Sequence, residues 1–165
     1  MKFILLDRIT ELVPGQRLCA VKALSLAEEY LADHFPRFPV MPGVLMIEAM
    51  AQAAGWLVRQ TEGFAHSVVM LAEARNVTYK SFVAPGHLFE IQVDAKEIGP
   101  TSSRFAGVGR CGQTEMVKAQ FGLRHFNLAE RNGDLSSLDE RLIASARQQM
   151  ALLWKPGTAG GAPGA

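Results

Sequence analysis

The order of hydrophobic and polar positions along the chain predicts one long helix surrounded by strands. The clearest element is the stretch 43–59, which is rich in Ala, Met and Leu, contains no proline and is apolar on nearly every side. A helix of this kind is normally buried on most sides. Pro42 directly precedes it, and proline suits the first turn of a helix because the N–H that it lacks would have no partner there. We therefore expect a buried helix at 43–59.

Strands are predicted on both sides of this helix, because apolar and polar residues alternate over short stretches bounded by Gly and Pro. One strand is expected before the helix, at 17–26. The strands after the helix are expected at 67–74, 74–82, 87–98, 103–111 and 115–126. A helix that is buried by a following antiparallel sheet belongs to the α+β class, and this is the fold class that we expect.

The two ends of the chain have different patterns. Apolar residues at positions 4, 5, 9 and 12 predict a short amphipathic helix at 3–12, and an apolar stripe predicts a second helix at 138–154. The tail after this helix is rich in Gly, Ala and Pro, which is typical of disorder. We expect a core domain at 1–130, a helical extension at 131–154 and a disordered tail at 155–165.

Composition and charge limit the classes of function that the chain could have. The chain has 165 residues, of which 48% are hydrophobic, so it is expected to form one domain with a short extension. Its 17 basic residues nearly balance its 16 acidic residues, which argues against a general nucleic-acid binder. Cys19 and Cys111 form no metal-binding or disulfide pattern. We find no stretch with the roughly 18 uncharged apolar residues of a membrane span and no signal peptide, so a cytoplasmic protein is expected.

The segment from His34 to Gln52, HFPRFPVMPGVLMIEAMAQ, contains the candidate chemistry. His34 precedes the long helix on chain that three prolines stiffen, and imidazole is the commonest general base. Glu48 lies inside the apolar helix, where burial disfavours the ionised carboxylate. A carboxyl group that stays protonated can deliver a proton to a leaving group. His34 and Glu48 are thus a candidate base and a candidate acid.

The start of the helix provides a third candidate group. The N–H groups of Gly43 and Val44 would lack partners within the helix and could polarise a carbonyl oxygen. A base, an acid and such donors suit removal of a proton next to a carbonyl, followed by loss of a β leaving group. Simpler interpretations are a structural role for His34 and an ion pair of Glu48 with Arg59 or a partner chain. Gln52, one turn beyond Glu48, is expected to hydrogen-bond Glu48 or the backbone.

Taken together, this segment resembles the signature of the 3-hydroxyacyl-[acyl-carrier-protein] dehydratases, the FabZ family. The segments LLDRITELVPGQRLCAVKAL and AEARNVTYKSFVAPGHLFEIQV also resemble that family, so the likeness covers most of 3–126. It implies a hot-dog fold, in which an antiparallel sheet wraps a long helix. It also implies dehydration of (3R)-3-hydroxyacyl thioesters to trans-2-enoyl thioesters in type II fatty acid biosynthesis, with no metal and no organic cofactor. The implied assembly is a homodimer with active sites at its interface, or a trimer of such dimers.

The resemblance assigns a role to each group of the segment. His34 would take the proton from C2, Glu48 would protonate the departing 3-hydroxyl group, and the N–H of Gly43 would hold the thioester carbonyl. His34 of one subunit would face Glu48 of the other. The related isomerising dehydratases have Asp at the acid position, so Glu48 favours the FabZ branch and dehydration alone.

Some positions depart from the family pattern. Arg37 stands where Gly is usual, His87 stands where Asp is usual, and YKSFV replaces a typical Phe-Arg-Arg-Pro-Val. The partner that the family implies, acyl carrier protein, is acidic. Candidate docking cations are therefore Arg37, Lys80, Arg104 and Arg110, with isolated solvated charges as the simpler interpretation.

Two other functions fit the expected fold. A hot-dog acyl thioesterase would also place a carboxylate on the long helix, but it would not need His34 at this spacing. A non-catalytic module that binds acyl chains or a carrier protein would keep the fold without the chemistry.

Overall fold

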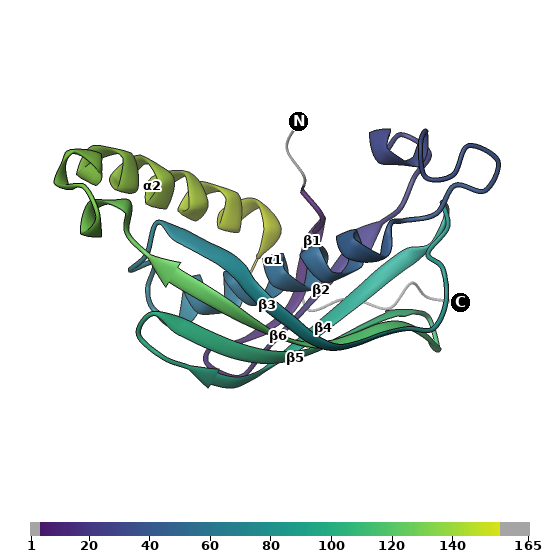
Figure 1. The fold of residues 1–165 in the computed structure, drawn as a ribbon, viewed down its shortest axis with the longest axis horizontal. Coiled ribbons are helices and arrows are strands. Elements are labelled where there is room, and N and C mark those ends of the chain that lie inside the picture. The colour runs from purple at the N-terminus through teal and green to yellow at the C-terminus, as the bar shows by residue number, and fades with distance from the viewer. Residues whose placement is uncertain (1–3, 156–165) are drawn as a thin grey trace.

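The structure, a computed structural model, describes residues 4–155 and consists of a curved antiparallel sheet with a long helix across its concave face (Figure 1). The strands are β1 (Arg8–Val13), β2 (Arg17–Ala23), β3 (Val68–Tyr79), β4 (Leu88–Ile98), β5 (Ser102–Cys111) and β6 (Thr114–Phe126). The helices are α1 (Gly43–Thr61) and α2 (Ser136–Leu153), with short 3-10 turns at Glu29–Leu31, Leu128–Glu130 and Gly133–Leu135. This is the hot-dog arrangement. None of the described helices is long and apolar enough to cross a membrane.

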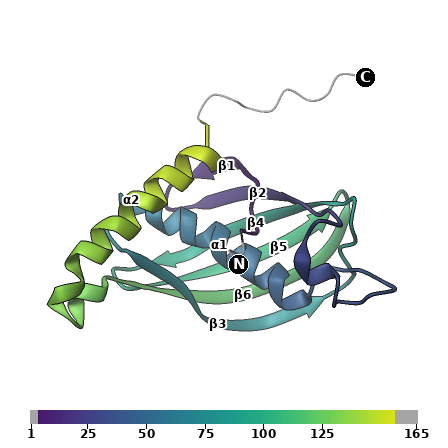
Figure 2. The ribbon, with the colours of Figure 1, turned by 90° about the horizontal axis from the view of Figure 1, so that it is seen from above.

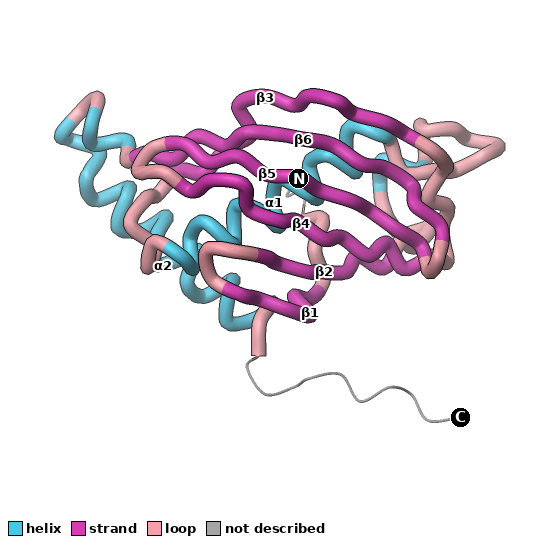
Figure 3. The backbone as a smooth tube through the Cα atoms, turned by 90° about the horizontal axis from the view of Figure 1, so that it is seen from below, coloured by secondary structure: helices cyan, strands magenta, loops and turns pink. Residues whose placement is uncertain are grey.

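The six strands pair in the order β1-β2-β4-β5-β6-β3, and all neighbours are antiparallel. Figure 3 shows the sheet from its convex side, with β3 at one edge and β1 at the other. In the central strands, every second side chain points toward α1, because successive side chains of a strand lie on opposite faces of the sheet. The outer side of β3 pairs with no other described strand.

The packing of α1 against the sheet forms the core. The helix buries a nearly continuous set of apolar side chains, among them Met46, Ala49 and Met50. Gly107 of β5 makes the close approach possible, because a Cβ there would lie 2.8 Å from Met50 Sδ of α1. At Gly109 of the same strand, a Cβ would lie 2.3 Å from the ring of Phe89 on the neighbouring strand β4, so this glycine makes room for packing on the face of the sheet. Side chains cannot approach this closely. The predicted helix at 43–59 is confirmed and extends to Thr61.

Two of the sequence predictions are wrong. The expected helix at 3–12 is strand β1 over its second half, because the backbone pairs with β2 there. A bulge between Ile9 and Glu11 shifts the register, so the apolar positions no longer alternate in a strand-like way. The two strands expected at 67–74 and 74–82 are the single strand β3, whose register shifts twice against β6. The strands expected at 17–26, 87–98, 103–111 and 115–126 are confirmed within three residues at each end.

Helix α2 lies across one end of α1, on the side of the sheet that α1 occupies (Figure 2). Its residues Ala146, Met150 and Leu153 are buried. The helical extension predicted at 131–154 contains this helix, whereas the predicted disordered tail lies outside the described residues except for Lys155.

Asp139 fixes the first turn of α2 to the rest of the molecule. Its carboxylate is buried and accepts hydrogen bonds from the Ser67 hydroxyl and from the backbone N–H groups of Leu128 and Ala129, the latter two at 2.9 Å. Burial by itself raises the pKa of Asp139, but the three hydrogen bonds to the charged form outweigh burial and hold the pKa below its usual value. The ionised carboxylate therefore stabilises the attachment of α2.

The lowered pKa of Asp139 predicts that the attachment of α2 to the rest of the molecule weakens in acid. A carboxyl group with a lowered folded-state pKa stabilises the fold above its unfolded pKa, near 4, and this contribution is lost as the pH falls through the lower folded-state value. We expect Asp139→Asn to be less stable than the wild type at pH 7 and to show a smaller loss of stability between pH 7 and pH 3. Urea unfolding at both pH values measures the difference. Asp134→Asn, an exposed carboxylate in the preceding turn, is the matched control, and equal unfolding free energies for the two variants at pH 7 would contradict the assignment.

Candidate active site

Glu48 lies on the second turn of α1 and lines a pocket. The pocket has a volume of about 580 Å³ and lies between α1, β3, α2 and the segment that leads into β1. Glu48 is partly exposed there, although the residues on either side of it in the sequence are buried. The wall that α2 contributes is made by Leu142, Ser145, Ala146, Gln149 and Leu153. Glu48 is thus one of the polar side chains that line this pocket.

Gln52 orients the Glu48 carboxylate. Its side-chain Nε2 donates a hydrogen bond to Glu48 Oε1 at 3.0 Å, and its Oε1 accepts one from the backbone N–H of Leu5 at 3.0 Å. Because the Leu5 N–H can only donate, it fixes which end of the amide faces Glu48. The hydrogen bond expected from the spacing of one helical turn is therefore present. Gln52 also lines the pocket.

Arg59 forms no ion pair with Glu48. Its guanidinium donates instead to the backbone carbonyls of His66 and Ser67, at 2.9 and 3.1 Å. Burial lowers the pKa of Arg59, and the nearby charge of Glu62 opposes this shift. The ion pair between Glu48 and Arg59 that the sequence left open is not present in the structure, and both residues line the pocket.

His34 lies on the loop before α1 and has the tautomer that a general base needs. Its Nδ1 is 3.0 Å from the backbone carbonyl of Val40. A carbonyl can only accept, so the hydrogen of the neutral ring is assigned to Nδ1 and the lone pair to Nε2. The loop is held in place by backbone hydrogen bonds from Val40 N–H to the His34 carbonyl and from Met41 N–H to the carbonyl of Val83.

Gly43 and Val44, the predicted backbone donors, are the first two residues of α1. Pro42 occupies the position before the helix, and no side chain of the described residues caps it. The N–H groups of Gly43 and Val44 point out of the helix start, because a helix provides acceptors only from its fourth or fifth residue on. The ring of Tyr79 lies against Gly43, where a Cβ would be 2.8 Å from its nearest atom. Gly43 therefore permits β3 to approach the helix start.

One chain does not bring His34 and Glu48 together. Among the described residues that line the pocket of Glu48, His34 is not included. The ring of His34 contacts Val40 and stacks on Phe35, with ring centres 4.3 Å apart. Within the described residues, His34 thus lies outside the pocket that Glu48 lines.

The four candidate docking cations do not form one cluster. Lys80 pairs with Glu115 at 2.9 Å, and Arg110 lies near the same carboxylate. Arg104 pairs with Glu97 and is six positions from Arg110 on β5, which corresponds to roughly 20 Å along a strand. Arg37 is exposed on the loop of His34. The structure thus separates Arg104 from Lys80 and Arg110.

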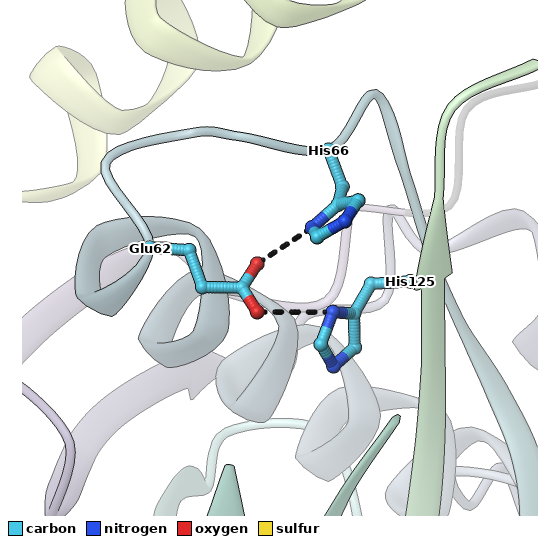
Figure 4. Close-up of side chains that lie close together, drawn as sticks. All are labelled: Glu62, His66 and His125. Carbon is cyan, nitrogen blue, oxygen red and sulfur yellow. Dashed lines mark hydrogen bonds and ion pairs between the residues drawn. The ribbon is translucent and has the colours of Figure 1, made fainter. Parts of the chain in front are cut away.

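The sequence analysis missed one cluster of titratable side chains, Glu62, His66 and His125 (Figure 4). His125 follows Ala119, Phe121 and Leu123 at alternate positions of β6, and all four are buried. That alternation was a usable signal for an inward-facing histidine. The contact with Glu62 depends on how the end of α1 meets β6, which no local pattern shows.

Comparison with known proteins identifies the family. The sequence model of the FabA-like domain matches residues 1–114. The chain belongs to the FabA-like domain family. Among curated members, this FabA-like chain is 37% identical over 120 residues to the 3-hydroxyacyl-[acyl-carrier-protein] dehydratase FabZ of Rhizorhabdus wittichii, covering 72% of this chain and 76% of that one. It is 39% identical over 111 residues to the FabZ of Aromatoleum aromaticum, covering 66% and 77%.

Solved structures agree on the fold of this FabA-like chain. The dehydratase heterocomplex ApeI:P from Xenorhabdus doucetiae superimposes with a TM-score of 0.66 at 22% identity, covering 81% of this chain and 90% of that one. The fluoroacetyl-CoA-specific thioesterase FlK, in a variant form, superimposes with a TM-score of 0.58 at 13% identity, covering 77% and 97%. At these identities the likeness concerns the fold alone. The same fold occurs in a dehydratase and in a thioesterase, so it does not decide between these two activities.

Proposed function

We propose that this chain dehydrates (3R)-3-hydroxyacyl chains, carried on acyl carrier protein, to trans-2-enoyl chains in type II fatty acid biosynthesis. The main structural support is Glu48, a carboxylate that opens into a pocket and is oriented by Gln52. The family and the FabZ relatives support the same reaction. In this proposal the reaction uses no metal and no organic cofactor, because an acid, a base and backbone donors suffice for it.

The first half of the reaction removes a proton from C2. His34 Nε2 carries the lone pair, since Val40 holds the hydrogen of the neutral ring at Nδ1. When Nε2 takes the C2 proton, the electron pair of the C–H bond moves toward the thioester carbonyl and its oxygen gains negative charge. The N–H groups of Gly43 and Val44, at the positive end of the α1 dipole, stabilise that charge.

The second half expels water. The electron pair returns to form the C2–C3 double bond, and the C3–O bond breaks. Glu48, as the proposed general acid, gives a proton to the departing hydroxyl, so that water leaves. Gln52 holds the carboxyl in its orientation through the hydrogen bond to Oε1. Transfer of the proton from His34 back to Glu48, directly or through solvent, restores both groups.

We propose that the complete site forms between two copies of the chain. The pocket of Glu48 is lined by Val69, Met70 and Leu71 at the beginning of β3, and β3 is an edge strand. An exposed edge strand is a ready template for pairing with another chain. Antiparallel pairing of two β3 strands about a two-fold axis would bring the end of the partner's β3 toward this pocket. That end contacts the start of α1 and leads toward the loop of His34, so the pairing would carry a second His34 toward Glu48.

Three of the candidate cations support carrier-protein docking, since Arg37 and Lys80 are exposed and Arg110 is partly exposed. Arg37, Lys80 and Arg110 are the proposed contacts for the acidic carrier, whereas the position of Arg104 argues against its taking part. A trimer of dimers is the proposed larger assembly, on family resemblance alone.

Enoyl absorbance during incubation with 3-hydroxyacyl carrier protein tests the reaction. We expect activity in the wild type and a loss of about 10²- to 10⁴-fold in Glu48→Gln, because removal of a general acid has an effect of this order. Glu140→Gln changes an exposed carboxylate of α2 in the same way and should keep full activity. Full activity in Glu48→Gln would contradict the assignment.

The same incubation separates the two other functions. Release of free thiol without enoyl product would identify a thioesterase. Tight binding of the acyl carrier protein without turnover would identify a binding module.

The α2 wall of the pocket predicts control of acyl chain length. Ala146 is buried and lines the pocket, so Ala146→Trp should shorten the space for the acyl chain. We expect kcat/KM for long chains to fall about tenfold relative to short chains, which is the order of discrimination that one methylene group provides. Ala144→Trp, on the exposed face of α2, is the control. An unchanged profile in Ala146→Trp would show that α2 does not limit the chain.

A further inference from the structure

The cluster of Glu62, His66 and His125 joins three separate parts of the fold. Glu62 directly follows α1, His66 lies in the turn before β3, and His125 lies near the end of β6. Figure 4 shows the Glu62 carboxylate facing both rings, with one oxygen directed to each. Its Oε2 is 2.8 Å from His66 Nδ1 and its Oε1 is 3.0 Å from His125 Nδ1. The ring centres of the histidines are 5.0 Å apart.

His125 is buried with one nitrogen unsatisfied. The side chain has no exposed surface, and its Nε2 lies 3.0 Å from the Ser103 hydroxyl. Its Nδ1 makes no hydrogen bond within the described part of the chain, although Glu62 Oε1 is close. The oxygen therefore lies away from the direction of a ring N–H. A buried polar nitrogen without a hydrogen bond destabilises the folded state, so its presence in the structure suggests that a partner binds there.

The charge of Glu62 is also incompletely balanced. Within residues 4–155, its ion pairs are with the two histidines and with no Lys or Arg. Arg59 is the nearby cation, but its guanidinium is directed to the carbonyls of His66 and Ser67. His66 Nδ1 is hydrogen-bonded to Glu62 Oε2 at 2.8 Å, whereas His125 Nδ1 and Glu62 Oε1 face each other at 3.0 Å with no hydrogen bond between them.

We infer that Glu62, His66 and His125 bind a divalent first-row transition ion, for which Zn²⁺ is the best chemical match. Two imidazole nitrogens and a carboxylate are a ligand set that zinc accepts, with water at the remaining position. Ligands at about 2.0–2.1 Å from zinc lie roughly 3 Å from one another. The two N–O separations of 2.8 and 3.0 Å are in this range, although they reach different oxygens of Glu62. The ligand atoms of the three residues lie within 4.8 Å of one another, so a small movement of the side chains would close them around one ion. Ser103 beside Nε2 orients the ring of His125, as outer partners of metal-binding histidines do.

The ion has a structural role. It ties the end of α1 to β6 and to the turn that precedes β3. That turn provides the carbonyls that hold Arg59 and the Ser67 hydroxyl that binds Asp139. The inference stands independently of the proposed reaction, because none of its three ligands lines the pocket of Glu48.

Cobalt(II) titration of the chelator-stripped full chain tests the site. We expect one Co²⁺ per chain with visible d–d absorbance, displacement of the cobalt by Zn²⁺, and a rise of several degrees in the Tm when Zn²⁺ is added in excess. His66→Gln, at a partly exposed ligand, should weaken Co²⁺ binding at least tenfold while the circular dichroism spectrum stays unchanged. His87→Gln replaces an exposed histidine outside the cluster and should bind like the wild type.

The titration also has outcomes that overturn the inference. A folded wild-type chain that binds no Co²⁺ and no Zn²⁺ at about 100 μM would show that the cluster is a hydrogen-bonded ion pair without a metal. Binding that His66→Gln leaves unchanged would place the ion elsewhere on the chain.

Discussion

The close packing of α1 against the concave face of the sheet is the constraint on which the rest of the structure depends. The helix is apolar almost all round, so its burial against the sheet forms the centre of the core. The approach requires glycine at position 107, because Met50 of α1 fills the space that a side chain would need there. Because the helix is fixed in this way, its packing also determines where its polar residues lie. Glu48, Gln52 and Arg59 lie along one side of α1 and face the pocket beneath α2.

The same constraint separates the two halves of the proposed chemistry. The loop of His34 precedes the first residue of α1 and is held by the hydrogen bond from Met41 N–H to the Val83 carbonyl. Glu48 lines the pocket beside β3. In the proposed dimer, a second chain at the edge of β3 completes the site, since that edge borders the pocket. The proposed division of the site thus rests on the packing of α1 and on the position of β3.

Much of this could be predicted from the sequence, because the strongest signals are local. The uninterrupted apolar run predicts α1, and regular alternation predicts β4, β5 and β6. His34, Gly43 and Glu48 lie in one continuous segment, so their joint pattern could be read without any tertiary information. Prediction failed where strands are irregular: the bulges in β1 and β3 break the alternation on which a strand prediction depends. It also failed where contacts join distant segments, as at Glu62 with His125 and at Ser67 with Asp139.

Mixing two inactive variants tests the division of the site most directly. A chain with His34→Ala and a chain with Glu48→Gln are co-expressed, and the dehydration rate of the mixed dimers is measured against that of each variant alone. In a two-fold dimer with shared sites, half of the randomly formed dimers are mixed and each holds one intact site, so about one quarter of wild-type activity should return. If each chain instead carried a complete site, the mixture would be as inactive as its components.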